Sequence, residues 1–66
     1  MKIVVNGKNH TFKEGTTLSE MIKALDLDIT GMIVERNLEV VTKSAYDSTL
    51  LQEGDNLELI RLVAGG

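Results

Sequence analysis

The sequence contains no cysteine and no proline, and its 66 residues include one Phe, one Tyr and no Trp. Without cysteine there can be no disulfide framework, no thiolate metal site and no cysteine nucleophile. The one histidine, His10, cannot hold a metal ion by itself. Because aromatic residues are so scarce, the hydrophobic core must be built from Leu, Ile, Val and Met side chains.

Runs of basic residues and long apolar runs are missing as well. The chain carries 7 Lys and Arg against 10 Asp and Glu, a formal net charge of −3, without a cluster of cations. Since nucleic-acid binding depends on clustered cations that neutralise phosphates, we expect no nucleic-acid partner. No apolar stretch approaches the roughly 18 residues of a membrane span, and residues 1–7 lack the apolar core of a signal peptide. We therefore expect a cytoplasmic protein without membrane contact.

Length and composition fit one globular domain, which opens with a predicted β-hairpin. Hydrophobic residues make up 42% and charged residues 26% of the chain, which is typical of folded proteins. Residues 2–6 are rich in β-branched side chains, and Asn6-Gly7 is the strongest short hairpin signal. Residues 9–13 are then expected to return as a second strand.

A helix is predicted after the hairpin. Thr17 and Glu20 have the spacing of a capping box, in which each side chain accepts a hydrogen bond from the other residue's backbone N–H. Apolar residues then recur at helical spacing and form one stripe on a helix of about two turns. The stripe consists of Leu18, Met21, Ile22 and Leu25.

The second half of the chain predicts three more strands. We expect them at residues 32–36, 39–41 and 56–62, with a loop or 3₁₀ turn that carries Tyr46 between the last two. The resulting order β, β, α, β, β, β predicts an α+β domain in which one helix covers one face of a mixed sheet. At this length the order is that of the β-grasp, the ubiquitin-like roll. We expect the domain to span residues 1–62 and residues 63–66 to be a flexible tail.

The last predicted strand is apolar on both faces near its end. Leu57 and Leu59 share one face, while Ile60 and Leu62 share the other. One interpretation is a bulge or a strand that is buried on both sides. The other interpretation is an exposed aliphatic patch beside the tail, where a partner protein docks.

The sequence ends with Gly65-Gly66. Glycine makes up about 7% of residues, so a chance pair at one fixed place has a probability of about 0.5%. Chance and a truncated sequence are the alternatives to a function. A functional tail has a physical reason, because two residues without Cβ can thread a narrow channel into the active site of another enzyme.

The chemistry that fits such a tail is activation of its carboxylate. A carboxylate is a poor acyl electrophile until ATP converts it to an acyl adenylate, from which a sulfur nucleophile displaces AMP to leave a thiocarboxylate. The chain has no glycine loop that could cradle phosphates, since Gly15, Gly31 and Gly54 are better explained as turns. A separate enzyme must therefore perform the phosphate chemistry.

With these features the whole chain resembles the thiamin-biosynthesis sulfur carrier (ThiS) family of ubiquitin-like β-grasp proteins. The family often has Pro-Arg where this chain has Thr42-Lys43, and Trp where it has Tyr46. The terminal pair of glycines is the most specific shared feature. The residues that carry the resemblance are Asn6-Gly7, Gly15-Thr16-Thr17-Leu18, Asn37 with Val40-Val41, Tyr46, Gly54-Asp55 and Val63-Ala64-Gly65-Gly66.

The resemblance implies a sulfur carrier and not an enzyme. An E1-like adenylyltransferase would activate Gly66 with ATP, sulfur would come from a donor such as a cysteine desulfurase, and thiazole synthase would accept it. ATP would be used by the adenylyltransferase, and the chain itself would bind no cofactor and no metal. Gly65 and Gly66 are the implied reaction site. The implied docking residues are Leu59, Ile60, Leu62, Val63 and Ala64.

Three alternatives share the fold. A carrier for molybdopterin synthesis or tRNA thiolation would use the same terminal chemistry, although the molybdopterin synthase small subunit is usually longer. A ubiquitin-like modifier would form isopeptide bonds through Gly66, but ubiquitin has Arg-rich residues before its Gly-Gly, where this chain has Leu62-Val63-Ala64. A plain interaction module would not need the terminal glycines at all.

Overall fold

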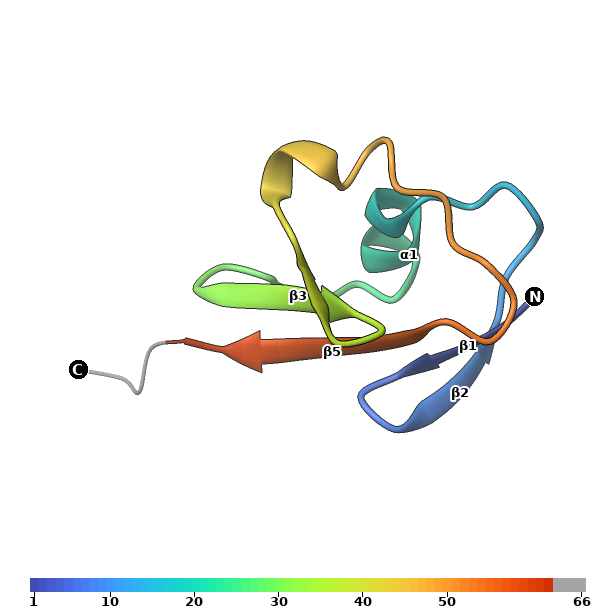
Figure 1. Cartoon of the computed structure of the whole chain (residues 1–66), viewed down its shortest axis with the longest axis horizontal. Coiled ribbons are helices and arrows are strands. Elements are labelled where there is room, and N and C mark those ends of the chain that lie inside the picture. The colour runs from blue at the N-terminus through green and yellow to red at the C-terminus, as the bar shows by residue number, and fades with distance from the viewer. Residues whose placement is uncertain (63–66) are drawn as a thin grey trace.

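The computed structural model describes residues 1–62, in which a five-stranded sheet packs against one helix (Figure 1). The strand order is β2-β1-β5-β3-β4, with β1 and β5 parallel and the other neighbours antiparallel. This arrangement confirms the predicted β-grasp roll. The expected flexible tail, residues 63–66, lies outside the described residues. The elements are β1 (Lys2–Val5), β2 (Lys8–Thr11), α1 (Leu18–Ala24), β3 (Met32–Arg36), β4 (Glu39–Val41), the 3₁₀ helix η1 (Lys43–Ala45) and β5 (Asn56–Arg61).

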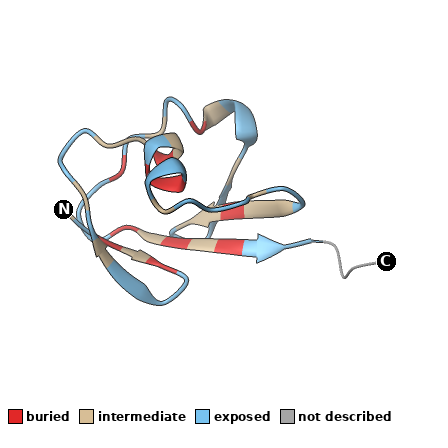
Figure 2. Cartoon of the chain, turned by 180° about the vertical axis from the view of Figure 1, so that it is seen from behind, coloured by how far each residue is buried: buried red, intermediate tan, exposed pale blue. Residues whose placement is uncertain are grey.

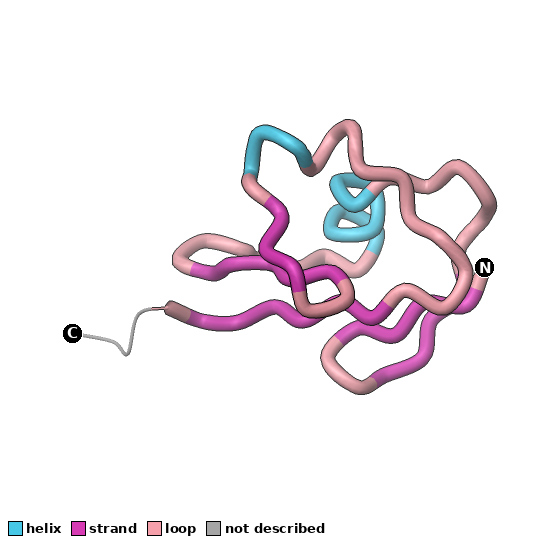
Figure 3. Tube along the Cα trace, viewed as in Figure 1, coloured by secondary structure: helices cyan, strands magenta, loops and turns pink. Residues whose placement is uncertain are grey.

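Two tight turns join the antiparallel strand pairs at the ends of the sheet (Figure 3). Asn6 and Gly7 have φ angles of 47° and 81°, and Asn37 and Leu38 have φ angles of 51° and 72°. Two successive positive φ angles match the right-handed twist of a hairpin and favour Asn-Gly. The first turn confirms the sequence prediction. The second places a leucine in the left-handed region, where its Cβ is crowded by the backbone.

The helix α1 begins as the sequence predicts. Thr17 Oγ1 accepts a hydrogen bond from the Glu20 backbone N–H at 3.1 Å, and Glu20 Oε1 accepts one from the Thr17 N–H at 2.8 Å. The apolar stripe faces the sheet, with Leu18, Met21 and Ile22 buried. No helix among residues 1–62 has the length and apolar character that a membrane crossing requires.

The hydrophobic core lies between α1 and the covered face of the sheet. It is aliphatic as predicted, apart from Tyr46, which follows η1 and points inward. Each fully buried Leu, Ile or Val stabilises the fold by about 1.5–3 kcal/mol relative to an exposed side chain. The buried core residues are Ile3, Val5, Leu18, Met21, Ile22, Val34, Tyr46, Leu51, Leu57 and Leu59.

The strand β5 runs through the centre of the sheet without a bulge against β3. Its pairing with β3 continues one residue to one, from Leu57 opposite Arg36 to Arg61 opposite Met32. Leu57 and Leu59 are buried, while Ile60 and Leu62 are exposed. Figure 2 shows buried positions along β5 and an exposed end. A bulge in this ladder, or burial of both faces, is therefore excluded as the reason for the two-sided apolar pattern.

Candidate functional site

The open face of the sheet carries aliphatic side chains around the end of β5. Val34 is buried and lies opposite buried Leu59, so the side chains of Ile33 and Ile60, which alternate with them, point away from α1. Ile60 is 38% exposed, and Leu62, with the same parity, is 62% exposed. We call Ile33, Ile60 and Leu62 the aliphatic patch. It lies at the end of the described residues, the last of which is Leu62.

The end of β5 extends beyond β1 and is paired there, within residues 1–62, with β3 alone. The parallel pairing of β1 with β5 ends at Val5 and Leu57. The Asn6 N–H then donates to the Leu57 carbonyl at 2.9 Å, and Asn6 Oδ1 accepts from the Leu59 N–H at 2.8 Å. Past this point β3 alone continues the pairing in the described part of the chain, up to the Leu62 N–H that donates to Gly31. The last residues of β5 thus leave one edge open beside the patch.

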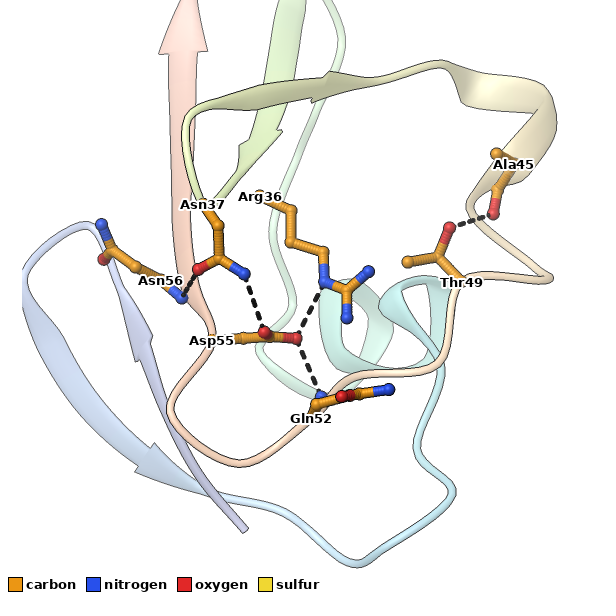
Figure 4. Close-up of polar contacts among 7 residues, drawn as sticks. All are labelled: Arg36, Asn37, Ala45, Thr49, Gln52, Asp55 and Asn56. Atoms are coloured by element: carbon orange, nitrogen blue, oxygen red, sulfur yellow. Dashed lines mark hydrogen bonds and ion pairs between the residues drawn. The ribbon is translucent and has the colours of Figure 1, made fainter.

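A buried carboxylate fixes the beginning of β5 (Figure 4). Asp55 is 5% exposed, and its Oδ2 accepts hydrogen bonds from Arg36 Nε at 2.9 Å and from the Gln52 N–H at 2.8 Å. Its Oδ1 accepts from Asn37 Nδ2 at 3.0 Å, while Asn37 Oδ1 accepts from the Asn56 N–H at 2.9 Å. This network, the Asp55 cluster, joins the β3–β4 turn to the loop before β5 and so sets the register of β5.

The Asp55 cluster also determines the charge of its carboxylate. Burial by itself raises the pKa of Asp55. Hydrogen bonds from Asn37, the Gln52 N–H and Arg36, together with the positive charge of Arg36, outweigh burial and lower the pKa below its ordinary value. Asp55 is therefore ionised at neutral pH, as its ion pair with Arg36 requires.

The sequence-predicted site residues fall into three groups. Ile60 and Leu62 lie on the surface in the aliphatic patch, while Leu59 lies in the core and supports the patch from below. The reaction site at Gly65 and Gly66 lies outside the described residues, as do two of the predicted docking residues, Val63 and Ala64. The roles of all of these residues stay predictions.

Sequence reasoning missed two parts of the site. Ile33 completes the patch, but its strand alone does not reveal that it lies opposite Ile60. The sequence places Asp55 next to Gly54 in a turn signal, whereas in the structure it accepts hydrogen bonds from three residues and holds Asn56 through Asn37. An aspartate directly before an apolar strand is the one sequence signal that could have indicated such a cluster, because a carboxylate in an apolar setting needs hydrogen-bond partners.

Acidic and histidine side chains do not converge on a metal site within residues 1–62. No group of three or more His, Asp or Glu residues there could hold a metal ion. His10 is half-buried and stacks against Phe12, with the two ring centroids 6.2 Å apart. The expectation of a chain without cofactor or metal stays a prediction.

Comparison with known proteins gives consistent matches. A family model described as the ThiS family matches residues 3–66. The chain is 38% identical over 66 residues to a thiazole synthase of Paramagnetospirillum magneticum, of whose length it spans 20%. It is 33% identical over 63 residues to the sulfur carrier protein ThiS of Bacillus subtilis, a match that covers 94% of this chain and 96% of that protein.

A solved structure extends the agreement to three dimensions. The crystal structure of the thiamine biosynthesis protein ThiS from Geobacter metallireducens matches with a TM-score of 0.86 and 33% sequence identity, over 100% of both chains. The family match likewise takes in nearly the whole chain, including the patch and the terminal glycines. The chain therefore belongs to the ThiS family, the sulfur carrier proteins of thiamin biosynthesis.

Proposed function

We propose that the chain is a protein co-substrate that carries sulfur as a thiocarboxylate on Gly66 and delivers it to a thiazole synthase. The observation that carries this proposal is the family match, which runs through Gly65 to Gly66. A carrier needs a rigid body that partners recognise and a reactive end that they can reach. We propose the aliphatic patch, which is exposed on the open sheet face at the end of β5, as the surface that partners recognise.

The proposed reaction has two steps. A carboxylate oxygen of Gly66 attacks the α-phosphorus of ATP in an E1-like adenylyltransferase, so that pyrophosphate leaves and an acyl adenylate forms. A hydrosulfide ion then attacks the acyl carbon, and the bond to the AMP oxygen breaks to give the thiocarboxylate and AMP. The chain contributes the acyl group, and the adenylyltransferase contributes the ATP and metal chemistry.

The aliphatic patch is proposed to position the tail during both steps. Ile60 and Leu62 are exposed, and leaving them in water has no benefit for the isolated domain. Burying them against a partner would hold the end of β5 at the entrance of its active site. The following glycines could then enter a channel that is too narrow for side chains.

A thiazole synthase is proposed as the sulfur acceptor. The P. magneticum protein named thiazole synthase contains a region similar to this whole chain within a polypeptide about five times as long. Two units joined in one polypeptide are held at high effective concentration, which favours proteins that act on each other. This supports a thiazole synthase over a molybdopterin or tRNA-thiolation enzyme as the partner.

Intact mass spectrometry tests the carrier chemistry. The purified chain is incubated with ATP, Mg²⁺, sulfide and the adenylyltransferase encoded in the same genome. We expect a mass gain equal to the replacement of one oxygen by sulfur, located at Gly66 by fragmentation. A variant that lacks Gly65-Gly66 should show no gain while it keeps its melting temperature.

The outcomes separate the alternatives. No gain with an adenylyltransferase that is active on another carrier would refute the carrier proposal. Isopeptide-linked conjugates in cell extracts would instead indicate a ubiquitin-like modifier. Transfer of the sulfur to a molybdopterin or tRNA-thiolation enzyme, with none to thiazole synthase, would keep the thiocarboxylate but overturn the proposed acceptor.

A further inference from the structure

Two glutamates face each other on the open side of the sheet. Glu35 on β3 lies directly opposite Glu58 on β5, one pair away from the Val34–Leu59 pair that points into the core. Side chains alternate along a strand, so both carboxylates share the open face with Ile33 and Ile60. Like charges directly opposite each other destabilise a sheet. The pair therefore needs an explanation that the isolated fold does not provide.

Nearby cations do not neutralise this pair. The ion pair formed within residues 1–62 joins Arg36 to Asp55, and neither glutamate has a Lys or Arg nitrogen within 4.0 Å among those residues. Arg61 lies opposite Met32, so its parity directs it to the other face of the sheet. Lys2 also lies on the open face. Because Val4 is opposite Asn56 in the parallel pair, Lys2 lies two residues before this point and Glu58 two residues after it, so the two are not neighbours.

The two glutamates lie beside the aliphatic patch, which indicates a role in contact with a partner. Glu35 is flanked on its own strand, two residues away, by Ile33, and Glu58 is flanked in the same way by Ile60. Both glutamates are partly buried by their neighbours. A partner that covers the patch would cover the carboxylates too, and an unpaired carboxylate in such an interface is strongly unfavourable. The partner must therefore bring a positive charge to this place.

We propose that Glu35 and Glu58 together form the receptor for one arginine side chain of the adenylyltransferase that docks on the aliphatic patch. This inference rests on the proposed function and specifies the surface of its partner. An arginine fits better than a lysine, because its planar guanidinium offers several N–H donors that can bridge two carboxylates. The flat face of the same group can lie against the aliphatic side chains next to the pair.

The pair would act on recognition and not on the reaction itself. Opposite charges that meet at the edge of an apolar contact raise the association rate and fix the register of docking. The proposed chemistry takes place at Gly66, which follows Glu58 by eight residues in the sequence. Neutralising the pair should therefore weaken docking, leave the maximal rate nearly unchanged, and relieve a repulsion within the isolated domain.

The test compares Glu35→Gln, Glu58→Gln and the double variant with wild type. The adenylyltransferase encoded in the same genome is assayed by ATP–pyrophosphate exchange over a range of carrier concentrations, at low and high salt. For the double variant we expect KM for the carrier to rise about tenfold at low salt, with kcat within about twofold. The difference should shrink at high salt, where charges are screened. The melting temperature should stay equal or rise, which a merely structural role would not produce.

Glu14→Gln is the control matched to each single variant. Glu14 is exposed in the turn before α1, and its replacement removes one charge without touching the open face. A rise in KM for this control equal to that of the single variants would mean a net-charge effect and would overturn the proposal. An unchanged KM in the double variant, or a rise that comes with a lower melting temperature and no salt dependence, would also overturn it. Absence of exchange with wild type would instead refute the proposed function, and the arginine receptor with it.

Discussion

Replacing Asp55 by Asn should destabilise the fold far more than its small change in shape implies. Oδ2 of Asp55 accepts two hydrogen bonds, so the amide oxygen of the variant must take this place, and the new NH₂ group then meets Asn37 Nδ2. Two donors face each other there. Asn37 cannot relieve this by flipping its amide, because its Oδ1 accepts from the Asn56 N–H. The Arg36 guanidinium also loses the charge of its partner.

The magnitude follows from these losses. One neutral hydrogen bond contributes about 1 kcal/mol and one to a charged group about 1.5–3 kcal/mol, so we expect a loss of about 2–3 kcal/mol. A chain of 66 residues has a free energy of unfolding of only about 3–10 kcal/mol. For a domain of this size the loss lowers the melting temperature by about 10–20 °C.

Urea unfolding measures the effect directly. Tyr46 is the only tyrosine, the chain has no Trp, and Tyr46 is buried, so its fluorescence reports loss of the core. Asp47→Asn is the control, because Asp47 is exposed and next to the reporter. Its effect should stay within about 0.5 kcal/mol. A loss below about 0.5 kcal/mol for Asp55→Asn, or an equal loss in the control, would refute the role assigned to the cluster.

Three further changes test other features. The pKa of Asp55 is lowered, and the Thr30 backbone N–H lowers the pKa of Asp28. Both carboxylates therefore stabilise the fold when the pH is above the ordinary aspartate pKa near 4. This contribution is lost as pH falls through the lowered values, so wild type should lose melting temperature below about pH 4 more steeply than Asp55→Asn; parallel curves would contradict this. Leu38→Gly should raise stability by about 0.5–1 kcal/mol, since Leu38 has a φ of 72° and is 83% exposed. A lower melting temperature would show that its conformation carries no strain. Thr17→Ala should cost about 1 kcal/mol in urea unfolding through loss of the helix cap, whereas Thr17→Ser should be nearly neutral, and equal losses would argue against the cap.

Local features were predictable because their signals lie within a few residues. Asn6-Gly7 specifies its turn through the positive φ angles that it tolerates, and Thr17 with Glu20 specifies the start of α1. The bounds of β3 agree with the prediction at both ends. The β-grasp topology followed from the order of such elements, because few folds accept this order in so short a chain.

The candidate site was less predictable because it depends on register between distant strands. Arg36 and Asp55 are 19 residues apart, and nothing in either segment alone indicates that they form an ion pair. The same holds for Glu35 and Glu58, which would lie on opposite faces if β5 were shifted by one residue. The two-sided apolar pattern of β5 indicated either an exposed patch or a strand buried on both faces. Only the structure, in which one face of the sheet is open and Ile60 and Leu62 are exposed, excludes the second alternative.

Because β1 pairs in parallel with β5, the sheet can form only after β5 has been synthesised. The first strand lies between β2 and β5 and depends on β5, since Val5 pairs with Leu57 and the Asn6 N–H donates to the Leu57 carbonyl. During synthesis, Ile3 and Val5 stay without this neighbour until residues 56–61 have been made. A product interrupted earlier would leave that apolar surface exposed and would be a target for proteolysis. Cells would thus accumulate few folded chains that lack β5 and the residues after it.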